Sequence, residues 1–332
     1  MAGIHLGPTA NAGGAKLNLP RYASIDIGTN SVLLLIADLK GSRLERVFED
    51  FRVTRLGEGA ITTGMLQSTP MARTLKVLCD YVQTAKEYGA ERIVATGTQI
   101  FRQVKNAATF LHQVEQKLSL SVHILTETEE AVLTFLGALD SYSTSQERIW
   151  AIDIGGGSTE LIFGNRRQID FQQSFPVGGV QLKIAFRLEE RLDAATLARL
   201  RQYLSGTLLV PQQGTHPGAM LGIGGTITTL AAVDQALPEY AFEKIDGYTM
   251  TRARIEQLFH QLNALSQKQR EQLPGMEKGR ADIILPASLI LLQVMDQLKI
   301  SRLIVSARGL RYGVILWQLG RANIEHRLGG CK

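Results

Sequence analysis

The sequence has few of the residues that build covalent or metal cross-links. Of its 332 residues only two are cysteines, Cys79 and Cys331. It contains no CxxC or HExxH motif and no His-Asp pair, so the usual zinc motifs and the HD type of metal site are excluded. This cysteine usage is typical of a reducing compartment, and we expect a cytoplasmic protein.

Long apolar runs are also missing. The longest, around Ile283 to Met295, is interrupted by Pro286 and Ser288 and is too short to span a bilayer. Residues 1–20 lack the unbroken apolar core of a signal peptide, so we expect them to form a loose extension and expect no membrane association.

The overall composition is that of a globular protein. Apolar residues make up 45% and charged residues 20%, which excludes a disordered chain, a coiled coil and a collagen-like repeat. The 36 basic and 31 acidic residues give a net charge of +5. This balance is compatible with a polyanionic ligand but too weak to indicate nucleic acid, which we do not expect as a partner. The length favours two domains.

Strand-like and helix-like segments alternate along the chain, which predicts an α/β architecture with a partly parallel sheet. The helix around 69–88 should have Thr69 as its cap and Pro70 at its first position. The expected strands are 24–27, 32–37, 92–95 and 122–125, and the other expected helices are 105–118, 127–139 and 227–233.

The most informative feature is an internal repeat. The segment from Ile25 to Ile36 recurs from Ile152 to Phe163, with six of twelve positions identical at a constant offset of 127. Each copy predicts a strand, a polar turn and a second strand. We interpret the two copies as one fold duplicated.

Each repeat places an aspartate, Asp26 or Asp153, inside an apolar strand directly before a glycine-containing turn. A carboxylate there needs a partner, and successive N–H groups of such a turn can bind phosphate oxygens. The alternative is a plain β-hairpin in which glycine serves geometry and aspartate caps the turn. The predicted phosphate-binding residues are Gly28, Thr29, Asn30 and Ser31 in the first copy and Gly155, Gly156, Gly157, Ser158 and Thr159 in the second.

Further candidates lie outside the repeated turns. A third glycine turn, Gly224-Gly225-Thr226, precedes a helix and could present free N–H groups to an anion. Arg102 could neutralise a phosphate or form a surface ion pair. Glu160 shares a strand face with Ser158, so it points either toward the turn or to solvent. Glu130 follows a helix start, where the helix dipole alone already favours an acid.

Together these motifs resemble the Ppx/GppA family of exopolyphosphatases and guanosine pentaphosphate phosphohydrolases. The resemblance rests on the two Asp-Gly turns and the Gly224 turn, and it runs from about Tyr22 to Leu319. Other matching stretches are Gly97-Thr98 with Arg102, Glu129-Glu130-Ala131, Gly279-Arg280-Ala281-Asp282-Ile283 and Ser306-Ala307-Arg308-Gly309-Leu310-Arg311.

The resemblance implies two actin-like (ribonuclease H-like) α/β domains with a cleft between them. Domain I would comprise 21–126 plus 306–332, and domain II 127–305. Longer family members carry an additional HD-like helical domain, so this chain resembles the short two-domain members. Many relatives have glutamate where this sequence has Tyr312, which removes an ion pair expected there.

The resemblance also implies residue roles. The catalytic glutamate of the family corresponds to Glu130, its second acidic position to Glu160 and its magnesium-associated aspartate to Asp153. Asp26 is a further candidate metal ligand. The expected cofactor is Mg²⁺ or another divalent cation, with K⁺ as a monovalent alternative.

The expected reaction is hydrolysis of a terminal phosphoanhydride, either of inorganic polyphosphate or of guanosine pentaphosphate to the tetraphosphate. A phosphotransferase of the actin and sugar-kinase type, passing phosphate to ADP or a small acceptor, is one alternative. A non-catalytic polyphosphate or nucleotide sensor is another, although a sensor has no need of the two glutamates. The sequence does not determine the oligomeric state, and a homodimer that extends the basic surface is compatible with it.

Overall fold

Two sheets of matching strand order organise the chain. The computed structural model describes residues 19–320 except 42, 143–147, 189 and 212–217. The described chain packs as two compact units, the first formed by 19–133 and 310–320 and the second by 134–309. The sequence predicts the boundaries between the two domains at residues 126 and 127 and at residues 305 and 306.

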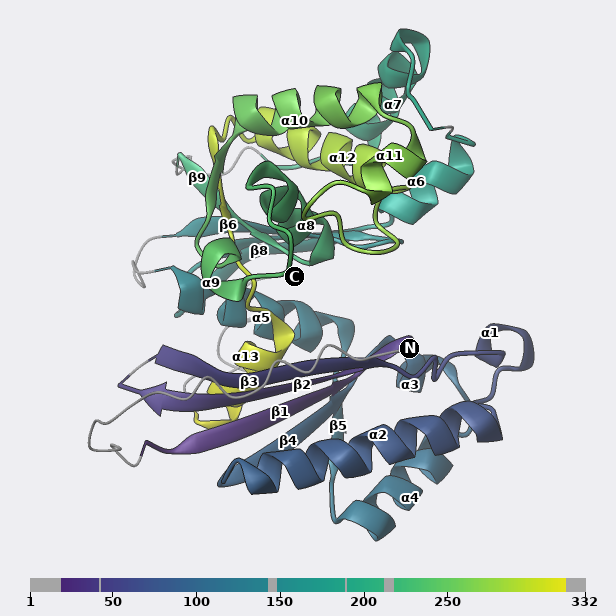
Figure 1. Cartoon of the computed structure of the whole chain (residues 1–332), viewed down its shortest axis with the longest axis vertical. Helices are drawn as coiled ribbons and strands as arrows, with labels where there is room; N and C mark the ends of the chain where they lie inside the picture. The colour runs from purple at the N-terminus through teal and green to yellow at the C-terminus, as the bar shows by residue number, and fades with distance from the viewer. Residues whose placement is uncertain (1–18, 42, 143–147, 189, 212–217, 321–332) are drawn as a thin grey trace. The chain divides into compact units, whose positions relative to one another are not determined.

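The first unit contains a five-stranded sheet in the order β3-β2-β1-β4-β5. β1 pairs antiparallel with β2 and parallel with β4. Figure 1 shows α2 and α4 on one face of this sheet and α13 on the other. The bounds are β1 Arg21–Ile27, β2 Ser31–Lys40, β3 Arg43–Val53, α1 Ala60–Thr63, α2 Ser68–Glu87, β4 Arg92–Gly97, α3 Gln99–Gln103, α4 Ala107–Leu118, β5 Val122–Ile124 and α13 Leu310–Gln318.

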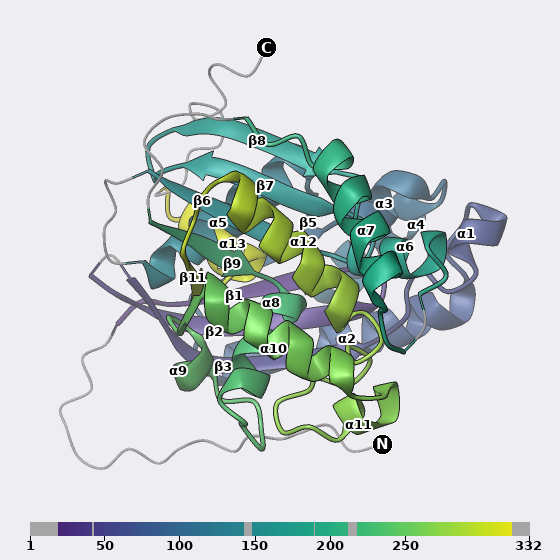
Figure 2. The same cartoon turned by 90° about the horizontal axis from the view of Figure 1, so that it is seen from above.

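The second unit repeats this topology. Its sheet runs β10-β11-β9-β6-β7-β8, so β8-β7-β6-β9-β11 corresponds to β3-β2-β1-β4-β5, and β10 is an added antiparallel edge. Figure 2 shows α10 and α12 lying side by side over this sheet. Its strands are β6 Ile149–Ile154, β7 Thr159–Gly164, β8 Ile169–Phe175, β9 Ala219–Ile223, β10 Thr249–Thr251 and β11 Arg302–Val305.

α5 Glu127–Ala138 and the short η1 Leu139–Ser141 lead from the first unit into the second, and the helices between η1 and α13 belong to the second unit. They are α6 Gly179–Ala185, α7 Ala194–Thr207, α8 Gly225–Asp234, α9 Phe242–Ile245, α10 Arg252–Ala264, α11 Gln267–Glu271 and α12 Ile284–Gln297. Within the described residues no helix is long and apolar enough to cross a membrane.

Each unit has its own hydrophobic core. Along the first strand of each repeat, side chains alternate between the core and the opposite face of the sheet, where the aspartate lies. Ile25 and Ile27 are fully buried under α2, whereas Asp26 between them projects from the face on which α13 packs. In the second unit Ile152 and Ile154 enter the core and Asp153 projects from the other face. The predicted duplicated α/β fold is confirmed by this repeated strand order.

The prediction for the helix near residue 69 is wrong at its start. α2 begins at Ser68, its N-cap is Gln67, and no side chain caps it. Thr69 and Pro70 therefore lie inside the first turn, where the proline still costs no backbone hydrogen bond because the first N–H groups have no partner within the helix.

Candidate functional site

The two repeated turns close with the same hydrogen bond. The amide of Gly28 donates to the carbonyl of Ser31 at 2.9 Å, and the amide of Gly155 donates to the carbonyl of Ser158 at 2.9 Å. A side chain at either glycine would crowd that carbonyl, at 3.3 Å for Gly28 and 3.2 Å for Gly155. The sequence repeat is thus a repeat of backbone geometry.

In each turn, carbonyl groups accept hydrogen bonds from a later segment, which is the loop after β3 in the first unit and the start of α6 in the second. In the first unit the Asn30 carbonyl accepts hydrogen bonds from the amides of Thr54 and Arg55, and the Thr29 carbonyl accepts from Gly57. In the second unit the amides of Val180 and Gln181 donate to Gly156.

The amide groups at the tips of these turns behave differently from the carbonyls. Within the described part of the chain, the N–H groups of Thr29, Asn30, Gly156 and Gly157 donate to no other group. Fixed carbonyls and open amides give each tip an excess of positive partial charge. This is the arrangement that binds phosphate oxygens.

Asp26 lies next to the first turn in an unusual environment. Its side chain is half-buried, and its Oδ1 is fully buried with no hydrogen-bond partner among the described residues. Burial raises the pKa of Asp26 to about 7; the negative charge of Glu130 raises it further, and the Arg311 guanidinium opposes both. Arg311 itself is largely buried and is ion-paired with Glu49.

Glu130 is held by Arg102. The Arg102 guanidinium donates to Glu130 Oε2 at 3.3 and 3.4 Å and also to the carbonyl of Leu125. Arg102 therefore connects α3 with the first turn of α5, where Glu130 is half-buried. The predicted phosphate contact of Arg102 stays a prediction; in this structure the guanidinium contacts the Leu125 carbonyl and the Glu130 carboxylate.

The second unit places two carboxylates directly opposite each other. Asp153 on β6 pairs with Glu160 on β7, so both project from the same face. The equivalent pair in the first unit is Asp26 with Leu33. Adjacent like charges on neighbouring strands disfavour the fold unless a cation or donor compensates them. Ser174 on β8 donates one hydrogen bond to Glu160 Oε1 at 2.8 Å.

This carboxylate pair fits a magnesium ion. Mg²⁺ is usually held by one or two carboxylates, with water and substrate phosphate completing its shell. No group of three or more candidate ligands occurs in the described residues, so the protein would supply only part of the shell.

The third turn carries a cation that the sequence alone did not assign. Gly224 has a φ of 86°, and a Cβ there would lie 2.4 Å from Asp153 Oδ1. A Cβ at Gly225 would lie 2.1 Å from an Arg280 nitrogen, so the Arg280 guanidinium packs directly on the start of α8. Arg280 also donates to Glu277 Oε2 at 3.3 Å. Carboxylate, glycine backbone and guanidinium thus meet at one helix start.

Two of the predicted phosphate-binding hydroxyls are used inside the fold. Thr159 donates to the Val177 carbonyl at 2.6 Å and Thr226 donates to the Ile154 carbonyl at 3.3 Å, and both side chains are buried. A hydroxyl has one hydrogen to donate. The geometry therefore does not support hydrogen bonds from these two hydroxyl groups to phosphate, although the backbone amides of their turns can still bind it.

Comparison with known proteins agrees with this geometry. The model of the Ppx/GppA phosphatase family matches residues 35–322. The chain belongs to this family. Exopolyphosphatase 2 of Mycobacterium tuberculosis is 30% identical over 320 residues, covering 90% of this chain and 98% of that protein. A guanosine-5'-triphosphate,3'-diphosphate pyrophosphatase of Aeromonas salmonicida is 27% identical and covers 91% of this chain, which spans 60% of that longer protein.

Solved structures of the Ppx/GppA family share the fold over nearly the whole chain. The Aquifex aeolicus family member has a TM-score of 0.83 at 32% identity, covering 91% of this chain and 98% of that one. An exopolyphosphatase from Cytophaga hutchinsonii has a TM-score of 0.74 at 27% identity, covering 92% and 99%.

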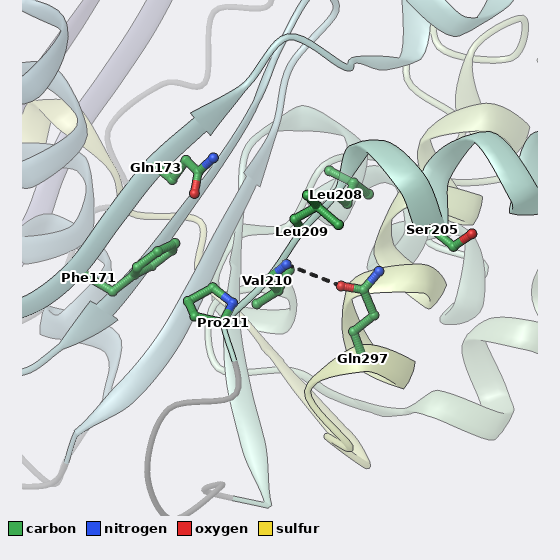
Figure 3. Close-up of a pocket in the computed structure, with 8 residues that line it drawn as sticks. All are labelled: Phe171, Gln173, Ser205, Leu208, Leu209, Val210, Pro211 and Gln297. Carbon is green, nitrogen blue, oxygen red and sulfur yellow. Dashed lines mark hydrogen bonds between the residues drawn. The ribbon is translucent and has the colours of Figure 1, made fainter.

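A separate pocket of about 450 Å³ in the second unit is not suited to the same chemistry (Figure 3). Its walls come from β8, the end of α7 and α12, and none of its lining residues is charged. The Gln297 side-chain oxygen is occupied by the amide of Val210 at 3.4 Å. The lining of this pocket therefore supplies no cation to a condensed phosphate.

Sequence reasoning missed Arg311 and Arg280 as site residues, although both lie in stretches that match the Ppx/GppA family. Their contacts join segments far apart in the chain, Arg311 with Glu49 and Arg280 with Gly225. Only the family stretches themselves could have indicated them.

Proposed function

We propose that this protein hydrolyses the terminal phosphoanhydride of inorganic polyphosphate, of guanosine pentaphosphate, or of both. The carrying observation is the pair of repeated turns whose tip amides are open, beside Asp26 in one unit and the Asp153–Glu160 pair in the other. Membership of the Ppx/GppA phosphatase family and relatives named for these two activities support the assignment.

In the proposed reaction backbone amides bind the substrate phosphate, and carboxylates activate water and hold the metal ion. The amides of Thr29 and Asn30 and those of Gly156 and Gly157 bind phosphate oxygens, and Arg280 adds positive charge at the third turn. Phosphoryl transfer needs little covalent help, so most of the rate enhancement comes from this positioning and charge compensation.

Glu130 is the proposed general base. It orients the attacking water and takes its proton, while Arg102 fixes the carboxylate through the two hydrogen bonds that it donates. A magnesium ion held by Asp153 and Glu160 of the second unit would compensate charge on the phosphate oxygens.

A phosphate-release assay tests the proposal. Long polyphosphate, short polyphosphate and guanosine pentaphosphate are each supplied with magnesium, with and without ADP. We expect free phosphate from at least one substrate without ADP, and Glu130→Gln should lower turnover by about 10²–10⁴ with binding largely retained. Release only in the presence of an acceptor would identify a phosphotransferase, and binding without release would identify a sensor. Either result would contradict the proposal.

A further inference from the structure

The loop that follows β3 is fixed directly onto the first turn. The amides of Thr54 and Arg55 both donate to the carbonyl of Asn30, at 2.9 and 2.8 Å, and the amide of Gly57 donates to Thr29 at 2.9 Å. A Cβ at Gly57 would lie 2.4 Å from the Thr29 methyl group, so the loop approaches the turn closely and a larger residue would displace the Thr29 side chain. The backbone of Arg55 is therefore held against the turn whose amides are open.

Arg55 adopts a conformation that arginine seldom takes. Its φ is 49°, in the left-handed region that is uncommon for residues other than glycine. The loop fixes it from both sides, because the Arg55 carbonyl also accepts a hydrogen bond from Glu58 at 2.9 Å. Such a residue is held by its surroundings, and side chains held in this way are often functional.

The charges around the loop leave the Arg55 guanidinium available. The nearest acid in sequence is Glu58, whose carboxylate is paired with Arg73 at 2.9 Å. Arg73 also donates to the carbonyl of Thr54 and thereby braces the loop. The Arg55 side chain is exposed and forms no ion pair with any described residue.

Other arginines of the first unit differ from Arg55. Arg102 and Arg311 are paired with Glu130 and Glu49. Arg92 is exposed and, within the described residues, also forms no ion pair. However, Arg92 lies at the start of β4, opposite Tyr22 and at the far end of the strand from the turn. Arg55 therefore combines an unneutralised charge with a fixed position at the turn.

We propose that Arg55 is a substrate-binding residue that contacts a phosphate group held by the amides of Thr29 and Asn30. The inference rests on the proposed function, because it takes condensed phosphate as the ligand. A guanidinium suits this role since it can donate two parallel hydrogen bonds to one phosphate. The loop after β3 then contributes a side chain to binding as well as support to the turn.

The test separates binding from folding. Arg55→Gly removes the guanidinium and relieves the positive φ, and Arg55→Lys keeps a charge. Arg92→Ala is the matched control, an exposed and unpaired arginine of the same unit. Binding of tripolyphosphate with magnesium is measured by calorimetry in variants that also carry Glu130→Gln. KM and kcat are measured in variants that keep Glu130. The melting temperature is recorded for every variant.

We expect Arg55→Gly to weaken tripolyphosphate binding and raise KM by about tenfold, with kcat nearly unchanged. Its melting temperature should equal or exceed that of the parent because glycine adopts the left-handed region without strain. Arg55→Lys should be intermediate in binding, and Arg92→Ala should match the parent.

Unchanged tripolyphosphate binding in Arg55→Gly would overturn the inference, and so would weaker binding accompanied by a lower melting temperature. If the parent protein releases no phosphate from any substrate but Arg55→Gly still weakens tripolyphosphate binding, the proposed hydrolysis fails and the role of Arg55 stands.

Discussion

Asp26 and Asp153 show how one residue of a repeat can acquire two environments. The aspartate itself, its turn and its register follow from the sequence repeat. The residue opposite the aspartate on the adjacent strand differs between the two copies. Asp26 lies opposite Leu33, whereas Asp153 lies opposite Glu160. Burial raises the pKa of Asp26, and the Asp153–Glu160 pair predicts a site for a cation.

The raised pKa of Asp26 predicts a pH-dependent stability. Because its folded pKa is about 7 and its ordinary value is 3.8, the native state binds more protons than the unfolded state between these values. The free energy of unfolding should therefore fall as pH rises from about 4 to 7, by up to about 1 kcal/mol per pH unit.

Asp26→Asn should remove this contribution. Urea unfolding at pH 5 and pH 8, in the presence of a chelator, measures it. The variant should gain stability relative to the parent at pH 8, and a difference between the two proteins that does not change with pH would contradict the environment described for Asp26.

The Asp153–Glu160 pair predicts a specific metal dependence. Glu160→Gln keeps the hydrogen-bonding shape but removes one of two adjacent charges, so we expect about a tenfold higher magnesium concentration for half-maximal phosphate release. Titrating magnesium at fixed substrate measures this. An unchanged magnesium requirement in Glu160→Gln would exclude Glu160 as a ligand.

At the scale of elements, the sequence predicts those that alternate cleanly and misses those that do not. β1, β2 and α2 follow from apolar periodicity. β3 is absent from the prediction because Arg43–Val53 mixes charged and apolar residues on an edge strand, where its burial is incomplete. The loop after β3, which supports the first turn, was missed along with the strand because it has no apolar periodicity of its own.

Helix α13 depends on a glycine for its packing. A Cβ at Gly313 would lie 1.8 Å from the carbonyl of Leu133 on α5, and backbone cannot move aside as a flexible side chain can. We expect Gly313→Ala to cost about 3 kcal/mol or more of unfolding free energy.

Gly206 provides the control for this substitution. It lies in α7, is exposed, and has nothing within 4 Å of its Cβ position, so Gly206→Ala should be neutral or stabilising. Thermal unfolding of both variants decides the point, and equal melting temperatures would show that the α5–α13 contact does not require glycine.

At the scale of the whole molecule, duplication was predictable and the side-chain networks were not. Two matching turns at an offset of 127 imply two copies of a fold, and two separate cores are found. Ion pairs that join distant segments leave no local pattern. The predicted cytoplasmic location, interdomain cleft and metal-ligand role of Asp26 stay predictions.

One such ion-pair network in the second unit joins the segment that follows α5 to the segment that precedes α13. Arg308 is ion-paired with the fully buried Asp140 and, at 2.9 Å, with Asp246. Asp140→Ala leaves Asp246 as a carboxylate partner of Arg308 but removes an ion-pair partner of both Arg308 and Arg166, so it should lower the free energy of unfolding by about 2 kcal/mol. Denaturant unfolding measures this, and a loss below about 1 kcal/mol would contradict a structural role for the network.

In the proposed reaction water is the attacking group that cleaves a terminal phosphoanhydride. The most direct measurement is the isotope content of phosphate released from polyphosphate or guanosine pentaphosphate in water enriched in oxygen-18. Hydrolysis predicts one labelled oxygen in each phosphate released, and Glu130→Gln should suppress that release. Phosphate that appears unlabelled on an acceptor such as ADP, with no labelled free phosphate, would contradict the account.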